Sequence, residues 1–208
     1  MTAIIRTARP ADLPAICDIT LKTAAYGGDA TALHRLPEIE GDVYAIPYMT
    51  FEPDFAFVLE DDLGLAGYVL GAPDSRRFEA RLDRHWWPKL RRKYADAAGR
   101  DLLPDDRRLL ASINDPHRAP ESVLPDYPSH LHIDILPRQQ GKGQGRRLIE
   151  TLFDALAAKG SPGVHLYASV RNDRAIAFYR RVGMTEFFRD ARAIGMCRRL
   201  PATKGPLR

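Results

Sequence analysis

The sequence predicts a mixed α/β fold, in which helices pack on a β-sheet within a single domain. Three observations support this prediction. The chain has 208 residues, of which 45% are hydrophobic and 28% charged, enough apolar content for one sizeable core. In the last third, apolar residues alternate between strand and helix periodicity. Nearer the N-terminus, two short apolar runs flank a polar turn, a pattern typical of a β-hairpin.

The N-terminal part is predicted to contain a strand, a helix and the hairpin. Residues Ile4–Thr7 form the strand, and Arg9–Asp12 opens a helix whose apolar side chains recur at helical spacing. The hairpin strands are Phe55–Leu59 and Leu65–Leu70, and the polar stretch Glu60–Gly64 joins them. This part of the chain therefore supplies one helix and three strands.

Two stretches, at about 26–53 and 75–128, are predicted to be insertions. The first is irregular and rich in glycine, proline and aromatic residues. The second begins with a charged helix, which Pro88 kinks or ends. The apolar stripe of this helix has a four-residue spacing and consists of Phe78, Leu82, Trp86 and Leu90. Because such a stripe packs against other apolar surface, we expect a single domain over 1–208 that carries both insertions.

The last third has the clearest pattern, two strand–helix pairs followed by two further strands. The expected strands are Leu131–Leu136, Val164–Val170, Thr185–Phe188 and Ala193–Leu200. One helix follows a glycine-rich loop, and its apolar face consists of Leu148, Ile149, Leu152, Phe153 and Leu156. Asn172 caps the second helix, which Gly183 ends. This order of strands and helices indicates a mixed sheet.

Composition and charge exclude several classes of protein. The chain has 31 Lys and Arg against 27 Asp and Glu, a net charge of +4, which does not require a nucleic-acid partner. Cys17 and Cys197 are far apart and show no metal-ligand spacing, so we expect no metal site and a reduced intracellular protein. The N-terminus lacks a secretory pattern, and no apolar run is long enough to span a bilayer. We therefore expect a cytoplasmic protein that binds neither nucleic acid nor membrane.

The glycine-rich loop between a strand and a helix is the most informative stretch. Gly141, Gly143 and Gly145 alternate, so that backbone N–H groups can converge without a Cβ in the way. The start of the following helix adds unpaired donors. Positive charges come from Arg138, Lys142, Arg146 and Arg147. The loop lacks the Walker and dinucleotide patterns and indicates a site for a phosphate or pyrophosphate, the alternative being a surface turn with solvated basic residues.

Two motifs in this region resemble those of a known family. The pattern Gln140-x-x-Gly143-x-Gly145 resembles the Q/R-x-x-G-x-G/A signature of the GNAT superfamily of acyl-CoA N-acyltransferases. Downstream, residues 172–184 resemble the second signature of that superfamily, in the expected order and context. The resemblance is clearest over residues 131–188. It implies a GNAT-type α/β fold with a mixed, mostly antiparallel sheet, splayed at the acetyl-CoA site and flanked by helices.

A narrower resemblance is to the acetyltransferase-like C-terminal domain of eukaryotic O-GlcNAcase. Residues 125–134 carry it, together with residues 42–48 and 85–88. In the eukaryotic domain, regarded as a pseudo-acetyltransferase, the glycine loop is degraded, whereas it is intact in this chain. The intact loop favours acetyl-CoA binding. The alternative that this resemblance implies is a non-catalytic module that binds acetyl-CoA or a peptide.

The GNAT resemblance implies acetyl-CoA as a co-substrate, and no metal is expected from the cysteine pattern. Its pyrophosphate would bind the N–H groups of the glycine loop, and its pantetheine arm would pair with the strand edge at Ile133 and Ile135. Asn172, which is also explained as a helix cap, often contacts the cofactor arm in the family. The expected cofactor-binding residues are Ile133, Ile135, Arg138, Gln140, Gly141, Lys142, Gly143, Gln144, Gly145, Arg146, Asn172 and Phe178.

The resemblance further implies acetyl transfer to a primary amine, as yet unidentified, in a direct ternary complex. Tyr179 matches the family's usual proton donor to the leaving thiolate, although its position also suits a core aromatic residue. Three residues on one side of a strand are candidates for the general base, in the order His132, Asp134 and His130. Because folds of this kind often dimerise, a homodimer is compatible with the resemblance.

Overall fold

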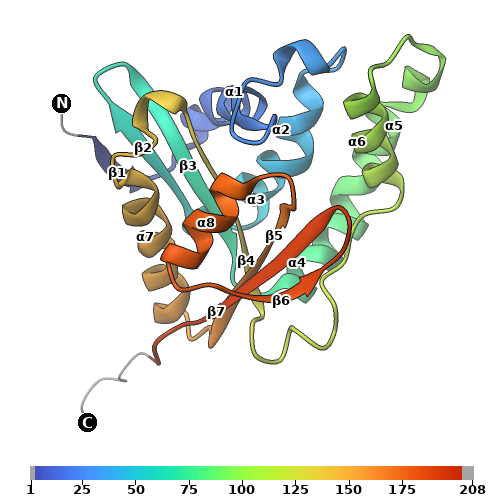
Figure 1. Ribbon diagram of the computed structural model, residues 1–208. Helices are drawn as coiled ribbons and strands as arrows, with labels where there is room; N and C mark the ends of the chain where they lie inside the picture. The colour runs from blue at the N-terminus through green and yellow to red at the C-terminus, as the bar shows by residue number, and fades with distance from the viewer. Residues whose placement is uncertain (1–2, 203–208) are drawn as a thin grey trace.

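Among the residues that the computed structural model describes, 3–202, seven strands form one central sheet (Figure 1). The strands are β1 (Ile4–Thr7), β2 (Ala56–Asp61), β3 (Gly64–Ala72), β4 (Ser129–Ile135), β5 (Gly163–Ser169), β6 (Thr185–Arg189) and β7 (Ala193–Arg199). They lie side by side in the order β1-β2-β3-β4-β5-β7-β6. This arrangement confirms the predicted mixed α/β fold, including the hairpin of β2 and β3.

Helices flank both faces of this sheet. They are α1 (Leu13–Thr23), α2 (Glu38–Tyr44), α3 (Ile46–Phe51), α4 (Ser75–Arg81), α5 (Trp87–Lys93), α6 (Pro104–Asn114), α7 (Gln144–Ala158) and α8 (Asp173–Arg181). A π-helical turn over Leu82–Trp86 joins α4 to α5. Pro88 is the second residue of α5, and because proline lacks an N–H and crowds the preceding turn, the α-helical hydrogen bonding is interrupted at this point.

The sheet divides between β4 and β5. Every other neighbouring pair of strands is antiparallel, whereas β4 and β5 are parallel and pair only at Ser129↔Val164 and His130↔His165. Beyond that point β4 continues to pair with β3, and β5 continues to pair with β7. The two strands therefore separate toward their carboxyl ends, which is the splay that the GNAT resemblance predicts.

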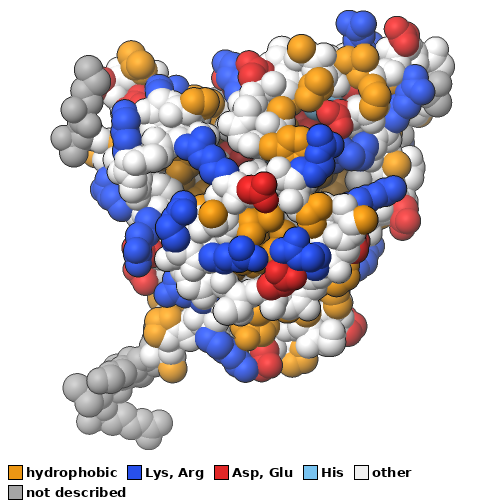
Figure 2. Space-filling model, viewed as in Figure 1, with side chains coloured by type: hydrophobic (Ala, Val, Ile, Leu, Met, Phe, Trp, Pro, Cys, Tyr) orange, Lys and Arg blue, Asp and Glu red, His pale blue; other side chains and the backbone are white. Residues whose placement is uncertain are grey.

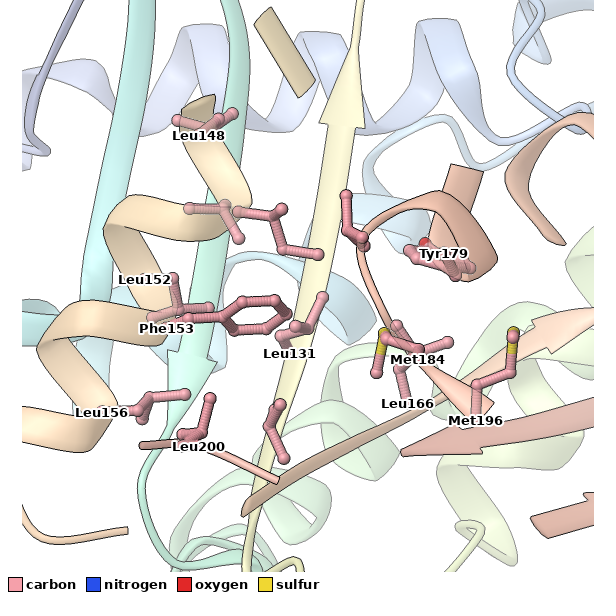
Figure 3. Close-up of a cluster of buried hydrophobic side chains, with 14 of the residues drawn as sticks. Leu131, Leu148, Leu152, Phe153, Leu156, Leu166, Tyr179, Met184, Met196 and Leu200 are labelled. Carbon is pink, nitrogen blue, oxygen red and sulfur yellow. The ribbon is translucent and has the colours of Figure 1, made fainter. Parts of the chain in front are cut away.

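One face of the sheet packs against α7 and α8. Leu148, Leu152 and Phe153 of α7 meet Leu131 of β4 in the largest buried cluster, which also includes Tyr179 of α8 (Figure 3). The strict spacing of apolar residues along α7 explains this contact, because residues three and four apart share one side of a helix. This cluster fixes α7, and with it the loop that precedes α7, against β4.

The opposite face is covered by α1 to α3 and by the second insertion. Ile16 and Ile19 of α1 pack on Tyr68 and Leu70 of β3. The two insertions share an apolar cluster that also includes Ala72 of β3; it is formed by Leu36, Ile39, Val43, Ala72, Phe78, Leu82, Trp86, Trp87, Leu90, Tyr94, Ala97, Leu102, Leu109 and Ile113. The predicted stripe of the charged helix is therefore buried, which holds α2 and α6 over the end of β4.

Two further properties bear on function. No helix within residues 3–202 is both long and apolar enough to cross a membrane. In the same part of the chain, no group of three or more His, Cys, Asp and Glu side chains is positioned to hold a metal ion.

Candidate active site

A cavity of about 1060 Å³ lies where β4 and β5 separate. Its walls come from the exposed parts of these two strands, from the loop before α7, from α8, and from α1, α2 and α6 on the other face. On the face shown in Figure 2, Lys and Arg side chains are spread around apolar side chains in the middle of the molecule. Because elements from both faces line the cavity, it passes through the division of the sheet.

The glycine-rich loop forms one end of the cavity. Gly141 and Gly143 have φ angles of 73° and 76°, in the left-handed region that favours glycine. At Gly145 the close neighbour is a side chain, since a Cβ there would lie 3.2 Å from the ring of Phe178, which would have to shift by a few tenths of an ångström. Gly143 is the N-cap of α7, so the N–H groups of the first turn have no acceptors within the helix. These donors, together with Arg146, make this end suitable for an anion.

The structure places nine of the twelve expected cofactor-binding residues at the cavity. They are Ile133, Ile135, Gln140, Gly141, Gly143, Gly145, Arg146, Asn172 and Phe178. Asn172 also caps α8, since its Oδ1 accepts a hydrogen bond from the N–H of Ala175 at 3.1 Å. Asn172 therefore caps α8 and lines the cavity at the same time, two roles between which the sequence alone did not decide.

The other three side chains, those of Arg138, Lys142 and Gln144, lie outside the cavity lining. Arg138 forms an ion pair with Asp61 at 3.0 Å and donates to the carbonyl of Leu65 at 2.7 Å. The hydrogen bond from Arg138 is the main reason why the pKa of Asp61 is lowered to about 2. Arg138 therefore holds the loop against the β2–β3 hairpin. The side chain of Gln144 accepts a hydrogen bond from Arg147 at 2.7 Å.

A hydrogen-bonded chain of side chains ends at His132 inside the cavity. Thr20 Oγ1 lies 3.0 Å from the hydroxyl of Tyr68, which donates to Asp134 Oδ2 at 2.6 Å. The same Oδ2 lies 3.0 Å from His132 Nε2. With Nε2 donating to this carboxylate, the neutral ring carries its lone pair on Nδ1. Asp134 thus orients the ring of His132.

Two aromatic rings hold His132 in place. The ring of Tyr44 stacks on it at 5.3 Å with an interplanar angle of 6°, and Tyr68 lies on it at 5.8 Å and 22°. The side chain of His132 is still 29% exposed. An ordered imidazole that remains accessible from the cavity is the arrangement that a general base requires.

His130 points to the same side of β4 but lies outside the cavity lining. Its Nδ1 is 2.7 Å from Ser75 Oγ, and its ring packs against Tyr48 and Phe78. Burial, and secondarily the neighbouring His165, lower the pKa of His130 from 6.5 to about 3. The structure therefore gives His130 a place in the core of the insertion and not a position from which it reaches a substrate.

The burial of His130 predicts acid sensitivity. Above pH 6.5 its ring is neutral in both the folded and the unfolded chain, whereas at lower pH only the unfolded chain binds the proton. Between pH 6.5 and about 5, this one group should lower the free energy of unfolding by about 2 kcal/mol. Denaturant unfolding of His130→Asn at several pH values should show a flatter dependence than the parent protein. The same substitution at the exposed His85 should leave the slope unchanged, and an unaltered slope in His130→Asn would contradict the assignment.

Tyr179 reaches the cavity from α8, on the other side of the division. Its side chain belongs to the core cluster and also lines the cavity. This position suits both a core aromatic residue and a proton donor that faces the cavity. Burial, and secondarily the charge of Asp134, raise the pKa of Tyr179 above its ordinary value. Its hydroxyl therefore keeps its proton at neutral pH and is available as a donor.

Five residues that line the cavity were not predicted from the sequence. They come from the two insertions and are His34, Glu40, Tyr44, Asp105 and Arg108. No motif marks them, because α2 and α6 reach β4 only through tertiary packing of apolar side chains. The spacing of Glu40 and Tyr44 on one side of a helix is the single local signal that they share a surface.

Comparison with known proteins agrees with this geometry. The model of the acetyltransferase (GNAT) family matches residues 29–184. Protein O-GlcNAcase of Rattus norvegicus is 27% identical over 151 residues, which are 72% of this chain and 16% of the relative. The match therefore spans about a sixth of that longer protein.

Two solved structures are similar over nearly their whole length. The crystal structure of SsHAT is 36% identical, covers 97% of this chain and 100% of its own, and superposes with a TM-score of 0.87. YncA of Salmonella typhimurium, solved with its cofactor acetyl-CoA, is 15% identical, covers 99% and 98%, and gives a TM-score of 0.59. The divided sheet, the glycine loop and the family match together lead to one conclusion: this chain belongs to the acetyltransferase (GNAT) family.

Proposed function

We propose that the chain transfers the acetyl group of acetyl-CoA to a primary amine in a direct ternary complex. The observation that carries the proposal is the cavity through the divided sheet, with an anion-binding loop at one end and the His132–Asp134 pair accessible beside it. Membership of the GNAT family and the similar fold of YncA, solved with acetyl-CoA, support it.

The residues of the cavity fit acetyl-CoA. The N–H groups from Gly141 to Arg146 would bind its pyrophosphate, because left-handed glycines and a helix start present donors to one point. Its pantetheine arm would lie along β4 at Ile133 and Ile135, where β4 has lost β5 as a partner strand. When bound there, acetyl-CoA supplies an acetyl thioester that is reactive toward an amine.

His132 would act as the general base for the acceptor amine. Its Nδ1 takes a proton from the amine nitrogen while Nε2 stays hydrogen-bonded to Asp134. The deprotonated nitrogen forms a bond to the acetyl carbon, and the bond from that carbon to sulfur breaks. A base positioned in this way accelerates such reactions by about 10²–10⁴-fold. Tyr68 is a positioning residue, because it reaches the amine only through Asp134.

Tyr179 would protonate the sulfur that leaves. Replacing Tyr179 by Phe removes only the hydroxyl and keeps the ring in its core cluster. We expect turnover to fall about 10- to 100-fold, the lower part of the range for a general acid. The dissociation constant of acetyl-CoA should change less than about threefold, because the hydroxyl acts on the departing thiolate. Release of free thiol with an accepted amine measures the first quantity, and calorimetric titration measures the second.

The control for this substitution is Tyr127→Phe, which removes a hydroxyl from a tyrosine outside the cavity lining. Turnover of Tyr127→Phe should equal that of the parent protein. If Tyr179→Phe also turns over as fast as the parent protein, the hydroxyl of Tyr179 takes no part in the reaction and its ring only packs in the core.

The proposed function is tested first by calorimetric titration with acetyl-CoA, with CoA and ATP as comparisons. Binding in the micromolar range that favours acetyl-CoA over ATP supports the assignment of the loop. A screen of primary amines by thiol release then tests the transfer itself. Thiol release that never exceeds hydrolysis without an amine would contradict the proposal.

A further inference from the structure

Two leucine side chains form the floor of the cavity, where the division of the sheet closes. The last residues of β4 and β5 that pair are His130 and His165, so Leu131 and Leu166 are the first residues beyond the pairing. Side chains alternate along each strand, so both leucines lie on the face of the sheet that α7 and α8 cover. Both line the cavity, although they are only 7% and 3% exposed.

With acetyl-CoA bound as proposed, its acyl end reaches this leucine floor. The glycine loop follows the carboxyl end of β4, and the pantetheine arm would run from there back along Ile135 and Ile133. The strand rises about 13 Å from Ile135 to Leu131. Just beyond Leu131, the pairing of β4 with β5 closes the cavity. The thioester would therefore lie beside His132, next to the closed end.

The face of the sheet on which the amine approaches decides where the acyl chain points. His132 and Tyr167 line the cavity on the face opposite the two leucines, the face that also carries the stacked rings of β4 and β5. The amine approaches on this face, because His132 would take its proton. The acyl chain is therefore left with the other face, where Tyr179 and the leucine floor surround it.

Buried methionines fill the space behind Leu166. Leu166 lies opposite Met196 of β7 and belongs to the same buried cluster as Met184 (Figure 3). Met196 is 0% exposed, Met184 is 2% exposed, and both lie outside the cavity lining. A longer acyl chain would have to push Leu166 into these close-packed side chains, which is unfavourable. Methionine adapts its shape readily, so a shorter residue at 166 would open space that the two methionines can adjust to.

We propose that Leu166 is a specificity-determining residue that limits the donor to acyl chains of two or three carbons, with Leu131 as the second wall. The inference rests on the proposed function for the position of acetyl-CoA, and it adds which donors are refused. Each methylene too many in an apolar pocket of fixed size costs about 10- to 200-fold in discrimination.

Donors of increasing chain length test the inference on the unmodified protein: acetyl-, propionyl- and pentanoyl-CoA. Calorimetric titration in the absence of an amine measures their binding, so no acceptor has to be known. Propionyl-CoA should bind within about threefold of acetyl-CoA, and pentanoyl-CoA at least about tenfold more weakly than acetyl-CoA. Equal or tighter binding of pentanoyl-CoA would overturn the inference, because a longer chain gains apolar contact wherever space is open.

The variant Leu166→Ala removes three carbon atoms from the floor, as many as pentanoyl adds to acetyl. Pentanoyl-CoA should then bind at least as tightly as acetyl-CoA, a gain of about tenfold or more in the ratio of the two affinities. The milder variant Leu166→Val should move this ratio in the same direction by a smaller factor. Both donors are titrated into the same preparation, so any loss of folded protein cancels in the ratio. An unchanged ratio in both variants would overturn the inference.

Leu156→Ala is the matched control for Leu166→Ala. Leu156 belongs to the same buried cluster, is 0% exposed and lies outside the cavity lining. The substitution therefore leaves a comparable space in the core without touching the floor. Its ratio of affinities should equal that of the parent protein. An equal gain in Leu156→Ala would mean that a loosened core admits the longer chain, and would overturn the inference.

The inference and the proposed function fail differently. A chain-length limit that Leu166→Ala removes, without transfer to any amine, would support the role of Leu166 and count against transfer. Transfer of acetyl and pentanoyl groups with equal efficiency by the parent protein would support transfer and overturn the role of Leu166. Failure of all three donors to bind would overturn both.

Discussion

Replacing His132 by Gln should lower turnover about 10²–10⁴-fold near neutral pH, the contribution of a positioned general base. Glutamine can keep an Nε2–H donor to Asp134 but has no basic nitrogen in place of Nδ1. The Tyr44 and Tyr68 rings that stack against His132 should then remain in place. Stopped-time assays of thiol release with a saturating amine measure the loss, and raising the pH should restore part of it, because more of the amine is then already deprotonated.

His85→Gln is the matched control for His132→Gln. His85 is exposed, lies outside the cavity lining and undergoes the same chemical change. Acetyl-CoA should bind both variants with the affinity of the parent protein, since neither touches the glycine loop. Full turnover by His132→Gln would move the role of base to Asp134, the remaining candidate that lines the cavity.

The anion-binding end of the cavity could be predicted from the sequence because its signals are local. Alternate glycines directly before a helix define a loop conformation within a few residues, and the structure has left-handed φ angles at Gly141 and Gly143. The apolar spacing of α7 likewise required only a helical period. What local sequence could not show is that the Arg138 side chain turns away to Asp61, a residue 77 positions earlier.

Local sequence predicts which side of β4 the three candidates for the general base occupy, but not which of them is accessible. Period-two alternation correctly places His130, His132 and Asp134 on one side of β4, as their pairing with β3 confirms. Their environments differ because the insertion buries His130 beside Ser75 and Phe78, whereas the sheet opens beside His132. That difference depends on contacts more than fifty residues apart, which alternation does not encode.

The residues that line the cavity from α2 and α6 could not be predicted for the same reason. The stretch 26–53 is predicted as irregular, yet it contains α2 and α3, which are short and separated by Ala45, with Pro47 in the first turn of α3. Short helices of this kind owe their stability to packing on the insertion's apolar cluster and not to their own propensity. Glu40 therefore lines the cavity only because tertiary packing holds α2 there.

Replacing Gly143 by Val should weaken acetyl-CoA binding at least about 100-fold. A β-branched side chain at a φ of 76° is strained by about 1–2 kcal/mol, and relief of that strain moves the N–H groups that face the cavity. Losing even one or two hydrogen bonds to a charged phosphate costs about 1.5–3 kcal/mol each. Calorimetric titration with acetyl-CoA measures the loss directly.

Gly160 provides the control that separates lost binding from lost stability. It lies just beyond the other end of α7, has a φ of 89°, and like Gly143 has no atom within 4 Å of where its Cβ would be. Gly160→Val therefore introduces a similar backbone strain in similar open space, but away from the cavity. Both variants should lose similar free energy of unfolding, and only Gly143→Val should lose acetyl-CoA. If both retain the affinity of the parent protein, the pyrophosphate does not bind at this loop; if both lose it equally, the defect lies in α7 as a whole.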